Sequence, residues 1–225
     1  KATSEYSIMG KDTRTIDVED IVTGKPLYGM DADYQGALQA VILRAPAQGA
    51  TIASYDKKAA LSVPGVRYVT EMKPRKGEYW GGQEKQIVSA GIAVIADSLW
   101  AAMQGKQKLN AQWKADPRYA DQSSAHQLDK FTHLVMGDSE AKARKTDGDV
   151  NAAFASARHK LDQVYKTPLF PHMCMEPFNC IADIRKQDAT VVVGHQFPHD
   201  VAATVEEVTG IDALKVEVIS KRMGG

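Results

Sequence analysis

Cysteine is scarce in this sequence, with only Cys174 and Cys180 among 225 residues. Two thiols are too few for a disulfide framework and too few for an iron–sulfur cluster, which takes four cysteine ligands. Net charge is also absent, because 28 Lys and Arg balance 28 Asp and Glu. Without a basic stripe interleaved with aromatic residues, the sequence does not predict nucleic-acid binding.

Long apolar runs are missing as well. None approaches the roughly 18–20 residues that a membrane-spanning helix needs, and Lys1 does not begin a signal peptide, so no transmembrane segment is expected. The apolar fraction of 44% and the charged fraction of 25% are typical of a globular protein with a core. The chain does not begin with Met, and it runs from an expected strand into terminal glycines. We therefore expect a piece of a longer polypeptide.

Residues 20–113 alternate between apolar strands and short helices, which is typical of a mixed α/β or α+β domain. The charged, glycine-rich stretch 73–85 is expected to be a loop. Asp56 and Ser98 are suited to cap the helices that follow them. The expected strands are 36–46, 66–72 and 86–96, and the expected helices are 56–66 and 99–109.

The second half begins with a polar stretch, residues 114–147, which contains one weak helical pattern at 127–134 and is typical of a connection between domains. Val150, Ala153, Phe154 and Ala157 then share one helix face. A second helical pattern over 201–208 is followed by Gly210, which is suited to a helix C-terminus. Strands are expected at about 159–167, 178–186, 189–194 and 214–219.

Residues 172–200 contain both cysteines and three of the six histidines, which raises the possibility of a metal site. Structural zinc needs four ligands that include closely spaced pairs. Cys174 and Cys180 lack such spacing, and Pro198 prevents His195 and His199 from sharing one helix face. We therefore expect no metal ligands here, only two buried free thiols and histidines in turns.

A cysteine nucleophile is the second alternative for this stretch, because Cys174 lies close to His172. Nothing nearby indicates an oxyanion hole or a residue that would orient the histidine, so this alternative is weak.

Two polar residues of the same stretch are suited to hydrogen bonding. Glu176 lies between Met175 and Pro177 where a strand is expected to enter a core, so its carboxylate needs partners such as backbone N–H groups. Gln196 follows buried valines at the end of an expected strand, where ligand-binding side chains collect in layered α/β folds. Its amide can donate and accept, although it could equally cap a turn between strand and helix.

Several motifs, taken in order, resemble those of a known family. HMCMEPFNCIADI, VVVGHQFPHDVAATVEEVTGI and VEVISKRMGG resemble the molybdopterin-binding large subunit of the xanthine dehydrogenase and aldehyde oxidoreductase family. LQAVILRAP and GIAVIADSLWAAMQGKQKLNAQW look like its a/b hammerhead domain, and GDVNAAFASA like the helix that opens its molybdenum domain. MEPFN and DIVTGKPLYGMD look closest to the isoquinoline 1-oxidoreductase and membrane-associated aldehyde dehydrogenase subfamilies.

The resemblance implies an α+β fold in which a hammerhead domain precedes a molybdopterin-binding domain. The implied segments are an N-terminal extension at 1–19, the hammerhead domain at 20–115, a connecting segment at 116–147, and the truncated start of the molybdenum cofactor-binding domain at 148–225.

The resemblance also implies roles for individual residues. Gln196 matches a glutamine whose amide contacts an oxygen ligand of molybdenum. Gly224 and Gly225 match the start of a glycine-rich loop whose backbone approaches the pterin, an approach that a Cβ would block. Glu176 matches a glutamate that we interpret as support for the site. His172 and Asn179 flank Glu176 and are expected to hold the same loop.

In such a subunit the pterin holds the metal, so this chain is expected to supply no metal ligand. The implied cofactor is molybdenum with molybdopterin cytosine dinucleotide, and the implied reaction inserts water-derived oxygen into an aldehyde or N-heterocyclic substrate. The family's catalytic base is a glutamate near the far C-terminus of a much longer subunit, so no catalytic residue is expected in this chain.

The implied partners are the remainder of the large subunit and a separate small subunit that carries [2Fe-2S] clusters, with a c-type cytochrome subunit as a further candidate. The subfamily implies export to the periplasm, with the cytoplasm as the alternative. A hypothesis of a different class is a non-catalytic hammerhead module for binding or assembly.

We predict that Cys174 and Cys180 are reduced and carry no metal, because neither has ligand spacing or a second cysteine pair. Intact mass before and after alkylation should show two modified thiols per chain. A disulfide between them, or one zinc ion per chain, would contradict the prediction.

Overall fold

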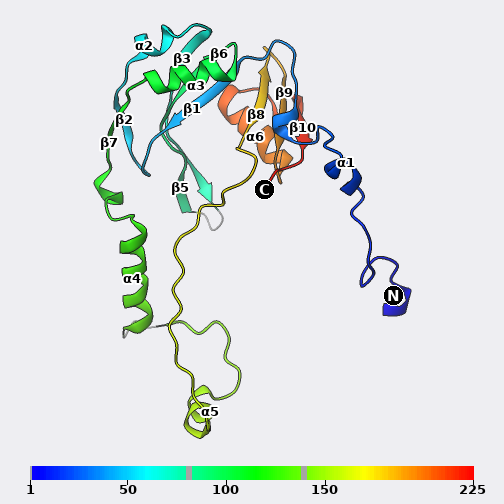
Figure 1. The fold of residues 1–225 in the computed structure, drawn as a ribbon, viewed down its shortest axis with the longest axis vertical. Helices are drawn as coiled ribbons and strands as arrows, with labels where there is room; N and C mark the ends of the chain where they lie inside the picture. The colour runs from blue at the N-terminus through cyan, green and yellow to red at the C-terminus, as the bar shows by residue number, and fades with distance from the viewer. Residues whose placement is uncertain (1, 80–82, 138–140) are drawn as a thin grey trace. The chain divides into compact units, whose positions relative to one another are not determined.

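The computed structural model describes residues 2–79, 83–137 and 141–225. Parts of the expected 73–85 loop and of the expected 116–147 connection therefore lie outside the described residues. Contacts divide the chain into two units, one of residues 38–171 and one of residues 1–37 with 172–225. Both units mix helices and strands, which confirms the expected mixed fold class (Figure 1).

The unit of residues 38–171 is organised around a three-stranded antiparallel sheet in the order β1–β6–β3. Its strands are β1 (Gln39–Arg44), β6 (Gly91–Ala96) and β3 (Val66–Met72). β6 is the central strand, so both of its edges are paired, and its nearly all-apolar sequence reflects burial. Ile92 and Val94 in this strand are fully buried.

Two helices of this unit begin at the capping residues that the sequence predicts. In α2 (Lys57–Leu61), Asp56 accepts a hydrogen bond from the Ala59 N–H at 2.8 Å. In α3 (Leu99–Lys108), Ser98 accepts one from the Ala101 N–H at 3.2 Å. A Cβ at Gly105 would lie 2.9 Å from methyl carbons of Val66 and Val94, so glycine allows α3 to approach the sheet closely.

The other elements of this unit are shorter or lie away from that sheet. They are the paired strands β2 (Thr51–Ser54) and β7 (Gln112–Lys114), the hairpin of β4 (Arg75–Tyr79) and β5 (Gln83–Val88), the 3-10 turn η3 (Pro117–Tyr119), and the helices α4 (Ser124–Met136) and α5 (Val150–Ser156). α4 extends the weak helical pattern expected at 127–134, and α5 confirms the helix expected after Gly148.

Three expectations for this part of the chain are wrong. The single strand expected at 86–96 is divided between β5 and β6, which lie in different sheets. The 73–85 stretch contributes to strands β4 and β5, because antiparallel backbone pairing does not require apolar side chains. The strand expected at 159–167 is absent, and residues 157–179, all described, contain no helix or strand. Alternating apolar residues there have no neighbouring strand to pair with, and a strand needs that partner.

The second unit contains a three-stranded sheet in the order β10–β9–β8, with β8 (Cys180–Ile184), β9 (Ala189–Gly194) and β10 (Val216–Lys221). β8 is antiparallel to β9, whereas β10 is parallel to it. The crossover between the parallel strands contains α6 (Pro198–Thr209) and the 3-10 turn η4 (Ala213–Lys215) (Figure 1). Gly210 ends α6 in the left-handed conformation, as expected.

The N-terminal residues of this unit form η1 (Thr3–Glu5), α1 (Val18–Val22) and η2 (Gly29–Asp31). Residues 20–37 therefore have their contacts in the unit that contains 172–225, although the sequence places them in the predicted hammerhead segment. The four predicted domain segments stay predictions. Among the described residues, no helix combines the length and hydropathy needed to cross a bilayer.

We predict that Ile92→Ala destabilises the chain by about 2–5 kcal/mol, because it leaves a cavity beside the central strand. Urea unfolding followed by circular dichroism would measure the change. Ile16→Ala is the control, since Ile16 is fully exposed and its truncation should change the midpoint little. Equal midpoint shifts for the two variants would contradict the assignment of the core.

Candidate functional site

One edge of the β10–β9–β8 sheet collects most of the residues that the sequence singles out. Cys180 at the start of β8 is opposite Val193, and Lys221 at the end of β10 is opposite Gly194. The start of β8 and the ends of β9 and β10 therefore meet at the same edge. Consequently the segments that contain Glu176, Gln196 and Gly224 all begin or end there.

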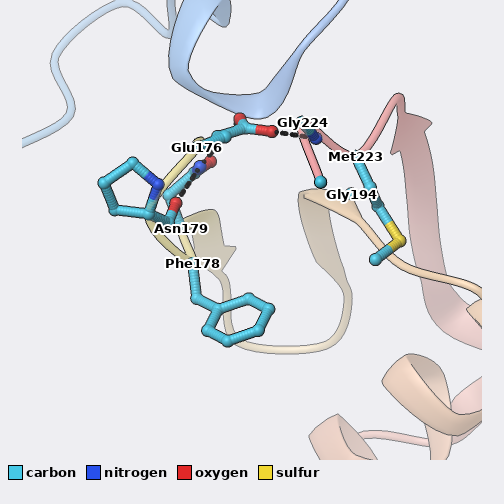
Figure 2. A pocket seen from close by; sticks show the side chains of 8 residues that line it. Glu176, Phe178, Asn179, Gly194, Met223 and Gly224 are labelled. Atoms are coloured by element: carbon cyan, nitrogen blue, oxygen red, sulfur yellow. Dashed lines mark hydrogen bonds between the residues drawn. The ribbon is translucent and has the colours of Figure 1, made fainter. Parts of the chain in front are cut away.

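The carboxylate of Glu176 joins three stretches of chain. Its Oε1 accepts hydrogen bonds from the Met30 N–H at 2.9 Å and from the Asn179 side-chain amide at 3.0 Å. Its Oε2 accepts one from the Gly224 N–H at 2.8 Å, and the bonds to Asn179 and Gly224 are drawn in Figure 2. The Glu176 N–H in turn donates to the Gly224 carbonyl at 3.2 Å. The backbone partners expected for this carboxylate are therefore present.

These hydrogen bonds stabilise the charged form of Glu176. The amide of Asn179 lowers the pKa of the carboxyl most, followed by the backbone N–H of Met30. Desolvation raises the pKa by less than either of these lowers it, and the N–H groups of Gly224 and Gly29 lower it further by smaller amounts. Glu176 therefore remains an acceptor through the neutral pH range. With its lone pairs directed at donors of its own chain, it is suited to holding structure rather than to transferring a proton.

Gly224, which is expected near a cofactor, and Gly194, which the sequence did not single out, both lie in crowded surroundings. A Cβ at Gly224 would collide with the side chain of Glu176, and a Cβ at Gly194 would lie 2.9 Å from the Arg222 carbonyl oxygen. Gly225 has φ of 142°, a conformation that favours glycine. Any larger residue at Gly224 would displace the side chain of Glu176, so the hydrogen bond between the two residues requires glycine at this position.

A shallow pocket opens between these residues (Figure 2). It is lined by residues 176–179, Gly194 and residues 223–225. Three of its eight lining residues are glycines, and the side chains of Phe178 and Met223 line it as well. Within the described part of the chain, no group of three or more His, Cys, Asp and Glu side chains could hold a metal ion, and both cysteines are free thiols.

The remaining predicted residues are placed differently. Gln196 is exposed in the connection between β9 and α6, and its amide forms no hydrogen bond to another described residue. His172 is also exposed and is not hydrogen-bonded to Glu176 or to the rest of the described chain. The structure thus joins Glu176, Asn179 and Gly224 directly, brings Gln196 to the same sheet edge, and leaves His172 outside the network.

Sequence reasoning missed Gly29 and Met30. The Met30 N–H donates to a carboxylate 146 positions away, and Gly29 packs against Asn179. Every residue except proline has a backbone N–H, so the residue type at position 30 does not indicate this hydrogen bond. The glycine was the one available signal, because a glycine can mark a close approach of backbone to another group.

The chain is similar in sequence to known molybdopterin-binding proteins. Residues 133–225 match the family model of the molybdopterin cofactor-binding domain. The whole chain aligns at 26% identity with isoquinoline 1-oxidoreductase subunit beta of Brevundimonas diminuta, covering 28% of that protein. Over its length the chain is therefore similar to the molybdopterin-binding large subunits of the xanthine dehydrogenase and aldehyde oxidoreductase family.

Two further proteins show the same similarity. The nicotine 6-hydroxylase large subunit of Paenarthrobacter nicotinovorans is 26% identical over 97% of this chain and 30% of its own length. The crystal structure of quinoline 2-oxidoreductase from Pseudomonas putida 86 superposes with a TM-score of 0.63 at 20% identity, over 95% of this chain and 30% of that one. That likeness shows a shared fold. The chain spans less than a third of the length of these relatives.

We predict a pH-dependent contribution of Glu176 to stability. Because its pKa in the folded chain lies below that of a free glutamate, about 4.3, its contribution is complete above that pH and is lost as the pH falls through the folded-state pKa. The difference in unfolding free energy between the wild type and Glu176→Gln should be largest near neutral pH and should shrink at lower pH.

Urea titrations at several pH values would measure this difference. Glu19→Gln, which removes an exposed carboxylate from α1, is the control and should give only a small difference. A difference for Glu176→Gln that does not change with pH would show that its carboxylate charge does not stabilise the fold.

Proposed function

We propose that this chain is part of a molybdenum hydroxylase large subunit that oxidises an aldehyde or an N-heterocyclic aromatic compound with oxygen from water. The observation that carries the proposal is the convergence of Glu176, Gln196 and Gly224 at one sheet edge inside the matched molybdopterin-binding region. The relatives' names support the substrate classes, since they include oxidoreductases of isoquinoline, nicotine and aldehydes.

The residues present fit a pterin cofactor. Gly194 and residues 223–225 line the pocket beside Glu176, so these residues border the space that a ligand would enter. We propose that Gly224 and Gly225 hold the cofactor through their backbone, that the free amide of Gln196 contacts it, and that Glu176 and Asn179 support the loop. When bound, the molybdenum cofactor supplies the redox chemistry, and the protein binds and orients it.

The finer assignments follow from the resemblance. We propose that the cofactor is molybdopterin cytosine dinucleotide and that electrons leave through [2Fe-2S] clusters on a separate subunit, since two cysteines cannot hold a cluster. A c-type cytochrome subunit is a further proposed partner. We also propose a hammerhead domain at 20–115 and the start of the cofactor domain at 148–225.

Cofactor analysis of the full-length protein that contains this chain tests the proposal. We expect about one molybdenum atom and one pterin per large subunit, measured by mass spectrometry of the metal and by fluorescence of the oxidised pterin. A folded protein that carries neither when it is produced in a host with molybdenum and pterin synthesis would favour a non-catalytic assembly module instead.

We predict that Gln196→Ala in the full-length enzyme lowers turnover while folding and molybdenum content stay unchanged. A neutral amide hydrogen-bonds the cofactor without adding charge, and if the interaction is stronger in the transition state its loss should reduce kcat by about tenfold to a hundredfold.

Gln187→Ala is the matched control, because Gln187 lies in the turn between β8 and β9 at the opposite end of the sheet. Unchanged turnover in the Gln196 variant at equal molybdenum content would mean that this glutamine only completes the turn between β9 and α6.

A further inference from the structure

The end of β10 is attached to a segment near the N-terminus, residues 27–31, that lies outside the matched molybdopterin-binding region. The Arg222 N–H donates to the Leu27 carbonyl at 3.0 Å, and Tyr28 and Arg222 form a parallel bridge. Earlier in the chain, Asp17 forms an ion pair with the Arg222 side chain. Asp17, Leu27 and Tyr28 therefore all contact Arg222, which comes shortly before Gly224 and Gly225, the residues proposed to face the cofactor.

Glu176 extends this attachment to Gly224. The Met30 N–H binds Oε1 of the carboxylate and the Gly224 N–H binds Oε2, so a single rigid group spans the two backbones. In Figure 2 the N-terminal ribbon, drawn in blue, passes beside Glu176. A displacement of residues 29–30 would therefore move or rotate the carboxylate, and Gly224 would have to follow or lose its hydrogen bond.

Gly29 is the sensitive position in this arrangement. It is buried, and the three atoms nearest to a Cβ added there all belong to the side-chain amide of Asn179. The Oδ1 atom of Asn179 would overlap the new Cβ, and the Cγ atom of Asn179 would lie only 3.2 Å from it. A methyl group at this position would therefore displace the amide that donates to Glu176. Glycine at 29 allows Asn179 and Met30 to bind the same carboxylate oxygen.

We propose that residues 27–31 are a template for the cofactor-binding loop and that Gly29 is a positioning residue that acts on Gly224 through Asn179 and Glu176. This inference rests on the proposed function for the identity of the ligand. The connection itself depends only on contacts within the chain, so it can be tested without the cofactor.

The first experiment measures the connection in the 225-residue chain by NMR of the backbone amides. The Met30 and Gly224 amide shifts should follow one titration, that of Glu176, and Glu176→Gln should abolish it in both. Gly29→Ala should move the midpoint of this titration upward, because the Asn179 donor is displaced. Val22→Ala, an exposed position in the nearby α1, is the control and should leave the midpoint unchanged.

A double-mutant cycle with Asn179→Ala gives the decisive comparison. If Gly29 acts through Asn179, then Gly29→Ala should shift the titration in the wild-type background and have no further effect when the Asn179 side chain is already truncated. The double variant also removes the steric overlap, so it remains informative if Gly29→Ala alone fails to fold. Additive shifts in the two backgrounds, or no shift at all in Gly29→Ala, would overturn the proposal.

The second experiment uses the full-length protein and measures how much molybdenum and pterin remains after prolonged dialysis. Gly29→Ala should release cofactor about fivefold faster than the wild type, roughly the effect of one lost hydrogen bond, while Val22→Ala should match the wild type. Equal release from Gly29→Ala and the wild type would reject the positioning role and leave the proposed function standing. A wild-type protein without cofactor would reject the proposed function, and the titration would still decide whether the connection exists.

Discussion

The candidate site depends on one charged group, the carboxylate of Glu176, and on the donors that surround it. An ionised carboxylate has two oxygens and about four acceptor positions, and here they are used by Met30, Asn179 and Gly224. Hydrogen bonds to a charged acceptor are stronger than those between neutral groups. Side chains from this part of the chain bury little apolar surface, so these polar contacts determine where the segments before β8 and after β10 lie.

The sheet provides the frame on which this carboxylate acts. Since α6 connects β9 to a parallel neighbour, the ends of β9 and β10 are on the same side, and the antiparallel β8 begins there as well. The topology alone therefore brings Gln196, Gly224 and Glu176 to one edge. Hydrogen bonds then refine the arrangement, and glycines at 29, 194 and 224 leave room for it.

Patterns local in sequence were predictable, and pairings distant in sequence were not. β3 and β9, the caps at Asp56 and Ser98, and the end of α6 at Gly210 follow from apolar runs and capping chemistry that short windows contain. The need of Glu176 for backbone donors was also visible. The donor at Met30 was not, because a backbone N–H carries no residue type. Two predictions were wrong for a related reason: the loop at 73–85, where β4 and β5 pair, and the strand at 159–167. Composition does not reveal whether a strand has a pairing partner.

The arrangement of the units along the chain has a consequence for synthesis on the ribosome. Residues 1–37 have their contacts with residues 172–225, while residues 38–171 form a unit between them. All of the intervening unit is therefore synthesised before residues 172–225, the partner of the first segment, have been made. At about 5–20 residues per second, the backbone of Met30 waits roughly 10–40 s for Gly224 to be translated. During that interval residues 1–37 lack the segment that they contact in the folded chain, and they remain open to chaperones and proteases.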